Sequence, residues 1–102
     1  MFIAMNRFKV RSGAEAEFEE LWRSRDRHLD EVPGFKEFKL LRGPAGDGFT
    51  LYSSHTVWES RQAFEDWTRS EAFRLAHKDA GKNKPLHIDA PVFEGFDVAL
   101  DR

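Results

Sequence analysis

Two polar side chains lie on faces of the chain that are otherwise apolar, and each could contact a ligand. Asn6 shares the apolar parity of an alternating segment with Phe8, where a buried amide is costly unless it is hydrogen-bonded. We expect its side chain either to bond the neighbouring backbone or to donate into a pocket. Arg25 shares the apolar face of a helical pattern with Leu29, and Arg is seldom buried without an anionic partner. We expect it either to reach solvent or to bind a ligand carboxylate.

His77 is the histidine best placed to bind a metal. It follows Phe73 by one helical turn and precedes an irregular segment. Its imidazole is either structural or a metal ligand, and haem iron needs only one proximal imidazole. The sequence contains three further histidines, His28, His55 and His87. None of the four forms a pair with the spacing of a zinc site, so zinc is not expected.

Aromatic residues are the unusual part of the composition. The 102 residues include 10 Phe, 3 Trp and 1 Tyr. Such a content is typical either of a core that uses Phe in place of Leu or of a pocket for a flat, apolar ligand. Trp67 lies on the inner face of a helical pattern, and it is either a core residue or part of the wall of such a pocket.

The elements that position these residues follow from periodicity. Alternation and β-rich composition predict strands over residues 2–10, 35–42, 49–58 and 92–100. The segment 43–48 is a cluster of turn residues, and the loop 79–91 is long enough to be functional.

Two helical patterns lie between these strands. The first runs from Ser12 or Gly13 to about Glu31, and Ser12 with Glu15 predicts a capping box. The second begins after Ser60 and restarts at Ser70. The order β-α-β-β-α-β predicts one α+β domain over residues 1–102 with a ferredoxin-like fold. Both helices cover one sheet face, so we expect a second subunit to cover the other.

Composition excludes several classes of function. A net charge of −2, without a dense basic block, argues against nucleic acid as a partner. The absence of Cys excludes disulfides and thiolate chemistry and suits a reducing compartment. No secretory signal or membrane span is expected, so we predict a cytoplasmic protein. No acid–base dyad, phosphate loop or nucleophile motif supports hydrolysis or phosphoryl transfer.

Three segments together resemble a known family. They are Asn6-Arg7, the block from Thr56 to Trp67 with its W-x-S-x-x-A-F-x-x-W pattern, and the segment from Ser70 to His77, accompanied by Pro33-Gly34-Phe35. The sequence resembles the IsdG-type haem-degrading monooxygenases of the antibiotic-biosynthesis-monooxygenase superfamily, with the HmuQ-like branch most similar. The W-x-S-x-x-A-F-x-x-W block marks the superfamily, whereas Asn6 and Ala76-His77 mark the haem branch.

The resemblance implies a site and an assembly. It implies that His77 is the axial ligand of the haem iron and that Asn6 and Trp67 are the other signature residues. Trp22 and Arg25 are similar to residues that flank the haem in some members, and a propionate is the expected partner of Arg25. The fold it implies is a dimeric α+β barrel, which agrees with the uncovered sheet face.

The resemblance also implies a reaction. Haem, as both substrate and cofactor, is opened by dioxygen to a biliverdin-like chain with release of iron. An external reductant or reductase supplies the electrons, Trp67 distorts the ring, and Asn6 donates on the oxygen side. Three alternatives stay open: a haem-storage protein, a cofactor-independent monooxygenase acting on a phenolic substrate, and a non-catalytic stress-type α+β barrel.

Overall fold

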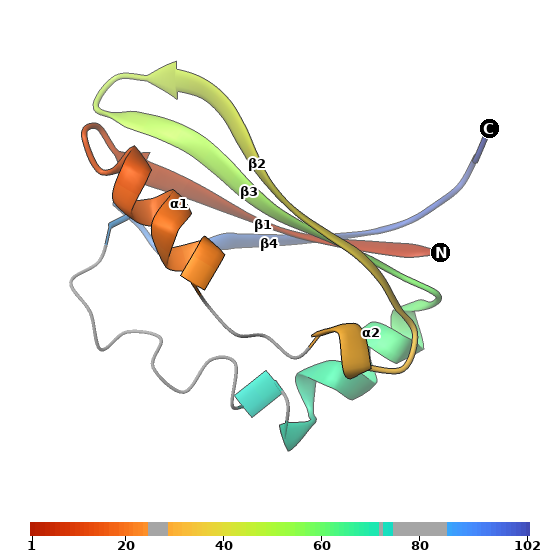
Figure 1. The fold of residues 1–102 in the computed structure, drawn as a ribbon. Helices are drawn as coiled ribbons and strands as arrows, with labels where there is room; N and C mark the ends of the chain where they lie inside the picture. Colours follow the sequence, from red (N-terminus) through yellow and green to blue (C-terminus); the bar gives the residue numbers. More distant parts are fainter. Residues whose placement is uncertain (25–28, 72, 75–85) are drawn as a thin grey trace.

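The computed structural model describes residues 1–24, 29–71, 73–74 and 86–102. Four strands form one antiparallel sheet of order β2-β3-β1-β4 (Figure 1). They are β1 (Phe2–Arg11), β2 (Phe35–Gly46), β3 (Phe49–Trp58) and β4 (Val92–Asp97). This order confirms the ferredoxin-like α+β fold expected from the sequence.

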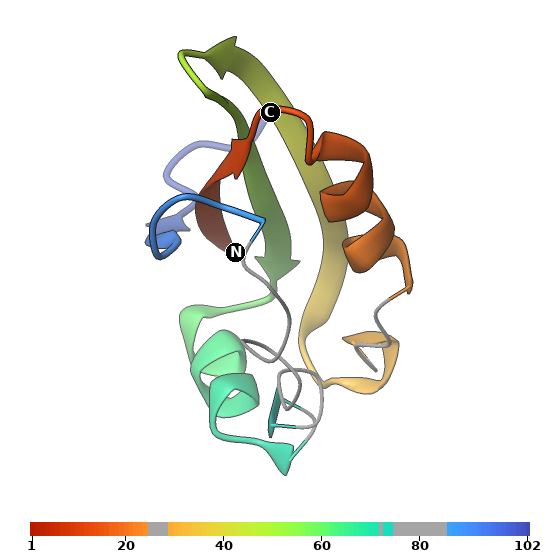
Figure 2. The same ribbon diagram turned by 90° about the vertical axis from the view of Figure 1, so that its left-hand side faces the viewer.

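Among the elements that the structure describes between these strands are α1 (Glu15–Ser24), the 3-10 turn η1 (Leu29–Glu31) and α2 (Arg61–Thr68). Both α-helices lie on the same side of the sheet (Figure 1). The turned view in Figure 2 shows α1 and α2 at different ends of the sheet. A stretch of the sheet surface therefore lies between the two helices.

Alternation along β1 determines which side chains face the helices. Phe2, Ala4, Phe8 and Val10 are buried, as their shared parity predicts. Two apolar clusters form on this face. Phe2, Ala4, Leu29 and Trp58 form the cluster near α2, and Phe8, Val10, Phe18 and Tyr52 form the cluster near α1. Because β1 contributes to both clusters, it connects the packing of the two helices.

The structure confirms Ser60 as the residue that caps the N-terminus of α2. The Ser60 hydroxyl accepts a hydrogen bond from the Ala63 N–H at 3.1 Å. The helix ends at Thr68, and the Ser70 hydroxyl accepts from the Phe73 N–H at 3.1 Å. Gly34 has a φ of +85°, and a Cβ there would lie 2.5 Å from the Ala63 Cβ. Glycine thus permits the turn before β2 to pack against α2.

Four predicted boundaries were wrong. The first helix begins at Glu15, because the Glu15 carboxylate accepts from the Gly13 N–H at 2.7 Å while the Ser12 N–H donates to the Gly48 carbonyl at 3.1 Å. The described part of α1 extends to Ser24, and Leu29–Glu31 form a 3-10 turn where the sequence predicted the end of this helix. β2 extends through the turn cluster to Gly46 with a register shift, and β4 ends at Asp97.

The second sheet face carries no α-helix from the described part of the chain (Figures 1 and 2). This surface is called the open face, and its apolar side chains are Ile3, Met5, Leu41, Phe49, Leu51, Val57, Val92 and Phe96. Val92 is 59% exposed and Phe96 is 49% exposed. Among the described residues, no helix has the length and apolar character needed to span a membrane.

Candidate functional site

Asn6 lies in the middle of β1 on the face that the helices cover. Its neighbours of the same parity are Ala4, in the α2-side cluster, and Phe8, in the α1-side cluster. Across the sheet it pairs with Ser54 of β3 and with Phe93 of β4. Ser54 is buried and Asn6 is half-buried. The structure therefore places an amide and a hydroxyl side by side between the two apolar clusters.

Trp67 packs into the cluster near α2. Its indole lies 5.2 Å from that of Trp58 and 4.8 Å from the Phe73 ring, centroid to centroid. Trp58 is fully buried, and its indole N–H donates to the Thr56 hydroxyl at 2.9 Å. Trp67 is only half-buried. One tryptophan thus belongs to the core, while the other forms the boundary of the core on the inner side of α2.

Trp22 forms the corresponding aromatic wall below α1. Its ring stacks on Phe38 of β2 with a centroid distance of 5.8 Å and an interplanar angle of 18°. It also meets the Phe8 ring edge-on at 5.8 Å. Both neighbouring rings come from strands, so Trp22 is held against the sheet.

An open cleft of about 440 Å³ lies beside Trp22. Its lining residues come from α1, β2 and β3, and they are Glu19, Trp22, Arg23, Phe38, Leu40, Arg42 and Tyr52. Leu40 pairs with Ser54, which in turn pairs with Asn6. The cleft therefore lies on the same face of the sheet as Asn6, and its nearest lining strand, β3, is the neighbour of β1. It combines apolar walls with basic side chains, which suits a flat ligand that carries carboxylates.

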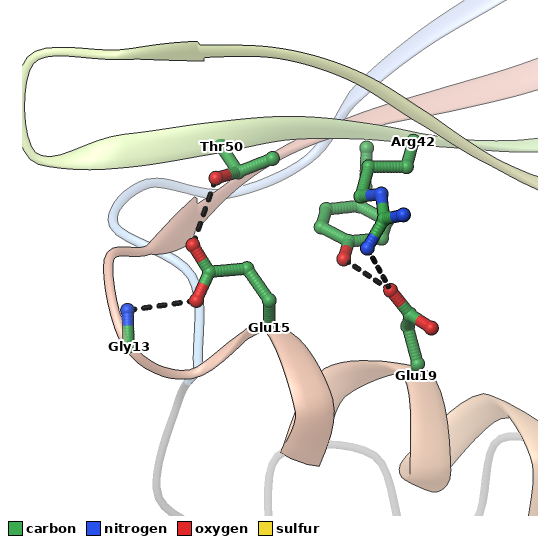
Figure 3. A network of polar contacts seen from close by, with 6 residues as sticks. Gly13, Glu15, Glu19, Arg42 and Thr50 are labelled. Atoms are coloured by element: carbon green, nitrogen blue, oxygen red, sulfur yellow. Dashed lines mark hydrogen bonds and ion pairs between the residues drawn. The ribbon is translucent and has the colours of Figure 1, made fainter.

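Glu19 connects α1 to the sheet at this cleft. Its Oε2 atom accepts from the Tyr52 hydroxyl at 2.6 Å and from Arg42 Nη1 at 3.2 Å. Figure 3 shows the Glu19 and Arg42 side chains pointing toward one another from α1 and the sheet. Burial, followed by the hydrogen bond to Glu19, raises the pKa of Tyr52. Tyr52 therefore remains a neutral donor near neutral pH.

The sequence-predicted site residues fall into two groups. Asn6, Trp22 and Trp67 all lie on the helix-covered face of the sheet. Arg25 and His77 lie outside the described residues, so their roles stay predictions. The rest of the chain that the structure describes contains no cluster of three or more His, Cys, Asp or Glu side chains suited to a metal ion.

Sequence reasoning did not single out Glu19, Arg42 or Tyr52. The signal available was weak, because each is a common residue type for its element. Arg42 does share its strand parity with Phe38 and Leu40, which indicates that its side chain projects from the helix-covered face.

Comparison with known proteins identifies the family. The family model for antibiotic biosynthesis monooxygenases matches residues 1–79. The chain belongs to the antibiotic biosynthesis monooxygenase family.

Two curated relatives match nearly the whole chain. A heme oxygenase (mycobilin-producing) from Mycobacterium tuberculosis is 34% identical over 99 residues, covering 97% of this chain and 90% of that protein. A heme oxygenase (staphylobilin-producing) from Staphylococcus aureus is 31% identical over 100 residues, covering 98% of this chain and 92% of that protein.

A solved structure shows the same architecture. The heme-degrader MhuD from Mycobacterium tuberculosis, solved with two hemes bound in its active site, superposes with a TM-score of 0.77 and 32% identity. The superposition covers 100% of this chain and 99% of that one. The similarity thus includes the sheet, both helices and the face between them.

Proposed function

We propose that this protein is a haem-degrading monooxygenase that opens haem to a linear tetrapyrrole and releases the iron. The observation that carries the proposal is the similarity to heme oxygenases over almost the entire chain. The geometry supports it, because the helix-covered face combines aromatic walls at Trp22 and Trp67 with a central amide at Asn6. An apolar pocket with few polar groups is the usual form of a small-molecule site.

Haem, when bound, supplies the iron at which dioxygen is activated and the carbon bridge that is cut. The chain's own residues have three roles. His77, in its neutral form, would hold the haem iron through an imidazole nitrogen. Asn6 would provide an N–H donor toward the reacting edge of the ring. Trp67 would provide an indole wall that sets the shape of the bound ring.

Electrons come from an external reductant in this proposal. Such a reaction suits a reducing compartment, so we place the enzyme in the cytoplasm. A chain without cysteine has no thiol to lose to oxygen chemistry during turnover.

We further propose that two copies pair through the open face to form an α+β barrel. Phe96 and Val92 are about half exposed there, and Leu41 is 39% exposed. Two ion pairs form within the chain on this face, Arg7 with Glu94 at 3.8 Å and Lys39 with Glu37. A second copy would bury the apolar side chains without isolating these charges.

The test of the function is aerobic turnover. Purified protein is titrated with hemin, then given ascorbate in air, and the products are analysed by mass spectrometry. We expect a Soret band on binding and its loss on turnover, with an oxygen-containing open tetrapyrrole formed. A stable Soret band would support haem storage instead, and a protein that ignores hemin would contradict both roles.

A further inference from the structure

The cleft beside Trp22 contains Arg42, whose hydrogen bond to Glu19 is longer than the one that Tyr52 makes to the same carboxylate. Arg42 Nη1 donates to Glu19 Oε2 at 3.2 Å, and the Tyr52 hydroxyl donates to the same oxygen at the shorter distance of 2.6 Å. The Arg42 side chain is 65% exposed, whereas that of Glu19 is 31% exposed. An exposed ion pair of this kind contributes little net stability. Arg42 can therefore leave Glu19 at small cost.

Glu19 does not depend on Arg42 for a hydrogen-bond partner. Tyr52 is almost fully buried, and its raised pKa keeps the hydroxyl protonated. The phenol continues to donate to Glu19 when Arg42 moves away. Glu19 thus holds the Arg42 guanidinium at the cleft. When Arg42 moves away, the Glu19 carboxylate keeps its hydrogen bond from Tyr52.

A ligand carboxylate can offer Arg42 a better contact than Glu19 does. The guanidinium carries five N–H donors in a planar fork and binds a carboxylate through two parallel hydrogen bonds. The contact with Glu19 is a single hydrogen bond to an oxygen shared with Tyr52. Arg42 also projects from β2 on the same face as Phe38 and Leu40, which form the apolar wall below it.

We propose that Arg42 binds a propionate of haem at the mouth of this cleft, exchanging Glu19 for the ligand carboxylate. The proposal rests on the proposed function, since it names the residue that holds one edge of that substrate. The stacked rings of Trp22 and Phe38 would contact the apolar part of the ring system near this edge. Arg42 is thus a substrate-binding residue that determines preference for a carboxylate-bearing tetrapyrrole.

The experiment compares haem with its dimethyl ester, in which both carboxylates are neutral, in one detergent-containing buffer. Soret titrations are made with the wild type, Arg42→Gln and the matched control Arg61→Gln. Arg61 is also exposed and ion-paired, with Asp97 at 3.1 Å, but it lies on α2 and does not line the cleft. We expect Arg42→Gln to weaken haem binding about tenfold and leave ester binding unchanged. Arg61→Gln is expected to change neither.

A second variant tests the exchange itself. Glu19→Gln keeps an oxygen for Tyr52 but removes the charge that competes for Arg42, so haem should bind a few-fold more tightly while the ester does not. Unchanged or weaker haem binding would contradict the exchange. Thermal unfolding of each variant verifies that it is folded.

The outcomes separate this inference from the proposed function. If wild type binds haem and Arg42→Gln binds haem and ester as the wild type does, the inference is wrong and the function stands. Equal weakening toward both ligands would show that Arg42 acts through the shape of the cleft, which also overturns the inference. A wild type without a Soret band would contradict the function, and the inference with it.

Discussion

Asn6 lies directly opposite Ser54 in the antiparallel pair of β1 and β3, on the face that both helices cover. Asn6 interrupts the apolar side of β1, with Ala4 and Phe8 on either side of it. In a sheet, residues directly opposite each other project from the same face. A rigid pair of strands, and not a loop, therefore fixes the position of the amide.

Replacing Asn6 by Ala should separate binding from turnover. We expect Asn6→Ala to bind hemin normally and to degrade it about 10²-fold more slowly, the lower end of the cost of removing one preorganised donor. Single-turnover spectroscopy with ascorbate measures this rate. Ser54→Ala is the control, because Ser54 lies opposite Asn6 on β3, and this variant should retain turnover. Wild-type turnover by Asn6→Ala would remove the amide from the mechanism.

Replacing His77 should remove the tight binding of ferric haem. A site with one proximal imidazole has no substitute ligand once it is lost. Soret titration of His77→Ala measures the loss. His87→Ala is the matched control, because His87 packs against Phe8 at 5.5 Å and bonds the Asp89 carbonyl at 2.7 Å. An unchanged spectrum for His77→Ala would assign the ligand to another residue.

The two neighbouring tryptophans, Trp58 and Trp67, should respond differently to substitution by Phe. Trp58 is fully buried and donates to Thr56, so Trp58→Phe should lower the free energy of unfolding by about 2 kcal/mol. Trp67 is half-buried, and Trp67→Phe should reduce haem turnover with a smaller loss of stability. Urea unfolding and turnover assays on both variants measure the two effects. If Trp67→Phe lowered stability strongly and left haem turnover unchanged, Trp67 would be a core residue only.

Glu15 should contribute to acid sensitivity. Hydrogen bonds from its own backbone N–H, from the Thr50 hydroxyl and from the Gly13 N–H lower its pKa below the ordinary value of 4.5 (Figure 3). A carboxyl whose folded-state pKa is lowered stabilises the fold above its unfolded-state pKa, and loses that contribution as pH falls through the folded-state pKa. The difference in Tm between wild type and Glu15→Gln should therefore shrink as pH falls below about 4.

Thermal unfolding measured between neutral and acidic pH tests this expectation. Glu17→Gln is the control, because Glu17 is exposed in the same helical turn. A Tm difference for Glu15→Gln that stays constant with pH would show that the Glu15 charge has no role in folding.

A charge on the open face should prevent pairing. Val57 lies between Ile3 and Glu37 on this face, and Val57→Lys would add a second cation beside the Glu37–Lys39 pair in the proposed interface. Light scattering after size-exclusion chromatography should give the mass of one chain for Val57→Lys and of two for the wild type. Gln62→Lys, exposed on α2, should remain paired. A monomeric wild type would contradict the barrel.

Local periodicity was enough to predict much of the fold. The alternation of β1 indicated its buried parity, and Ser60 and Ser70 indicated where the helical segments begin. These features depend on residues at most four positions apart, whose geometry the backbone fixes. The resemblance of the second helix and of Asn6 to a known family likewise required only residue types and their spacing.

Only the tertiary structure brought together Glu19, Arg42 and Tyr52, which are separated by 23 and 33 positions along the chain. No periodicity encodes such a contact, because it forms when α1 packs against β2 and β3. The start of α1 was decided in the same way, since Thr50 of β3 binds the carboxylate of Glu15. The sequence determined which faces are apolar, whereas packing determined which charged side chains meet at their edges.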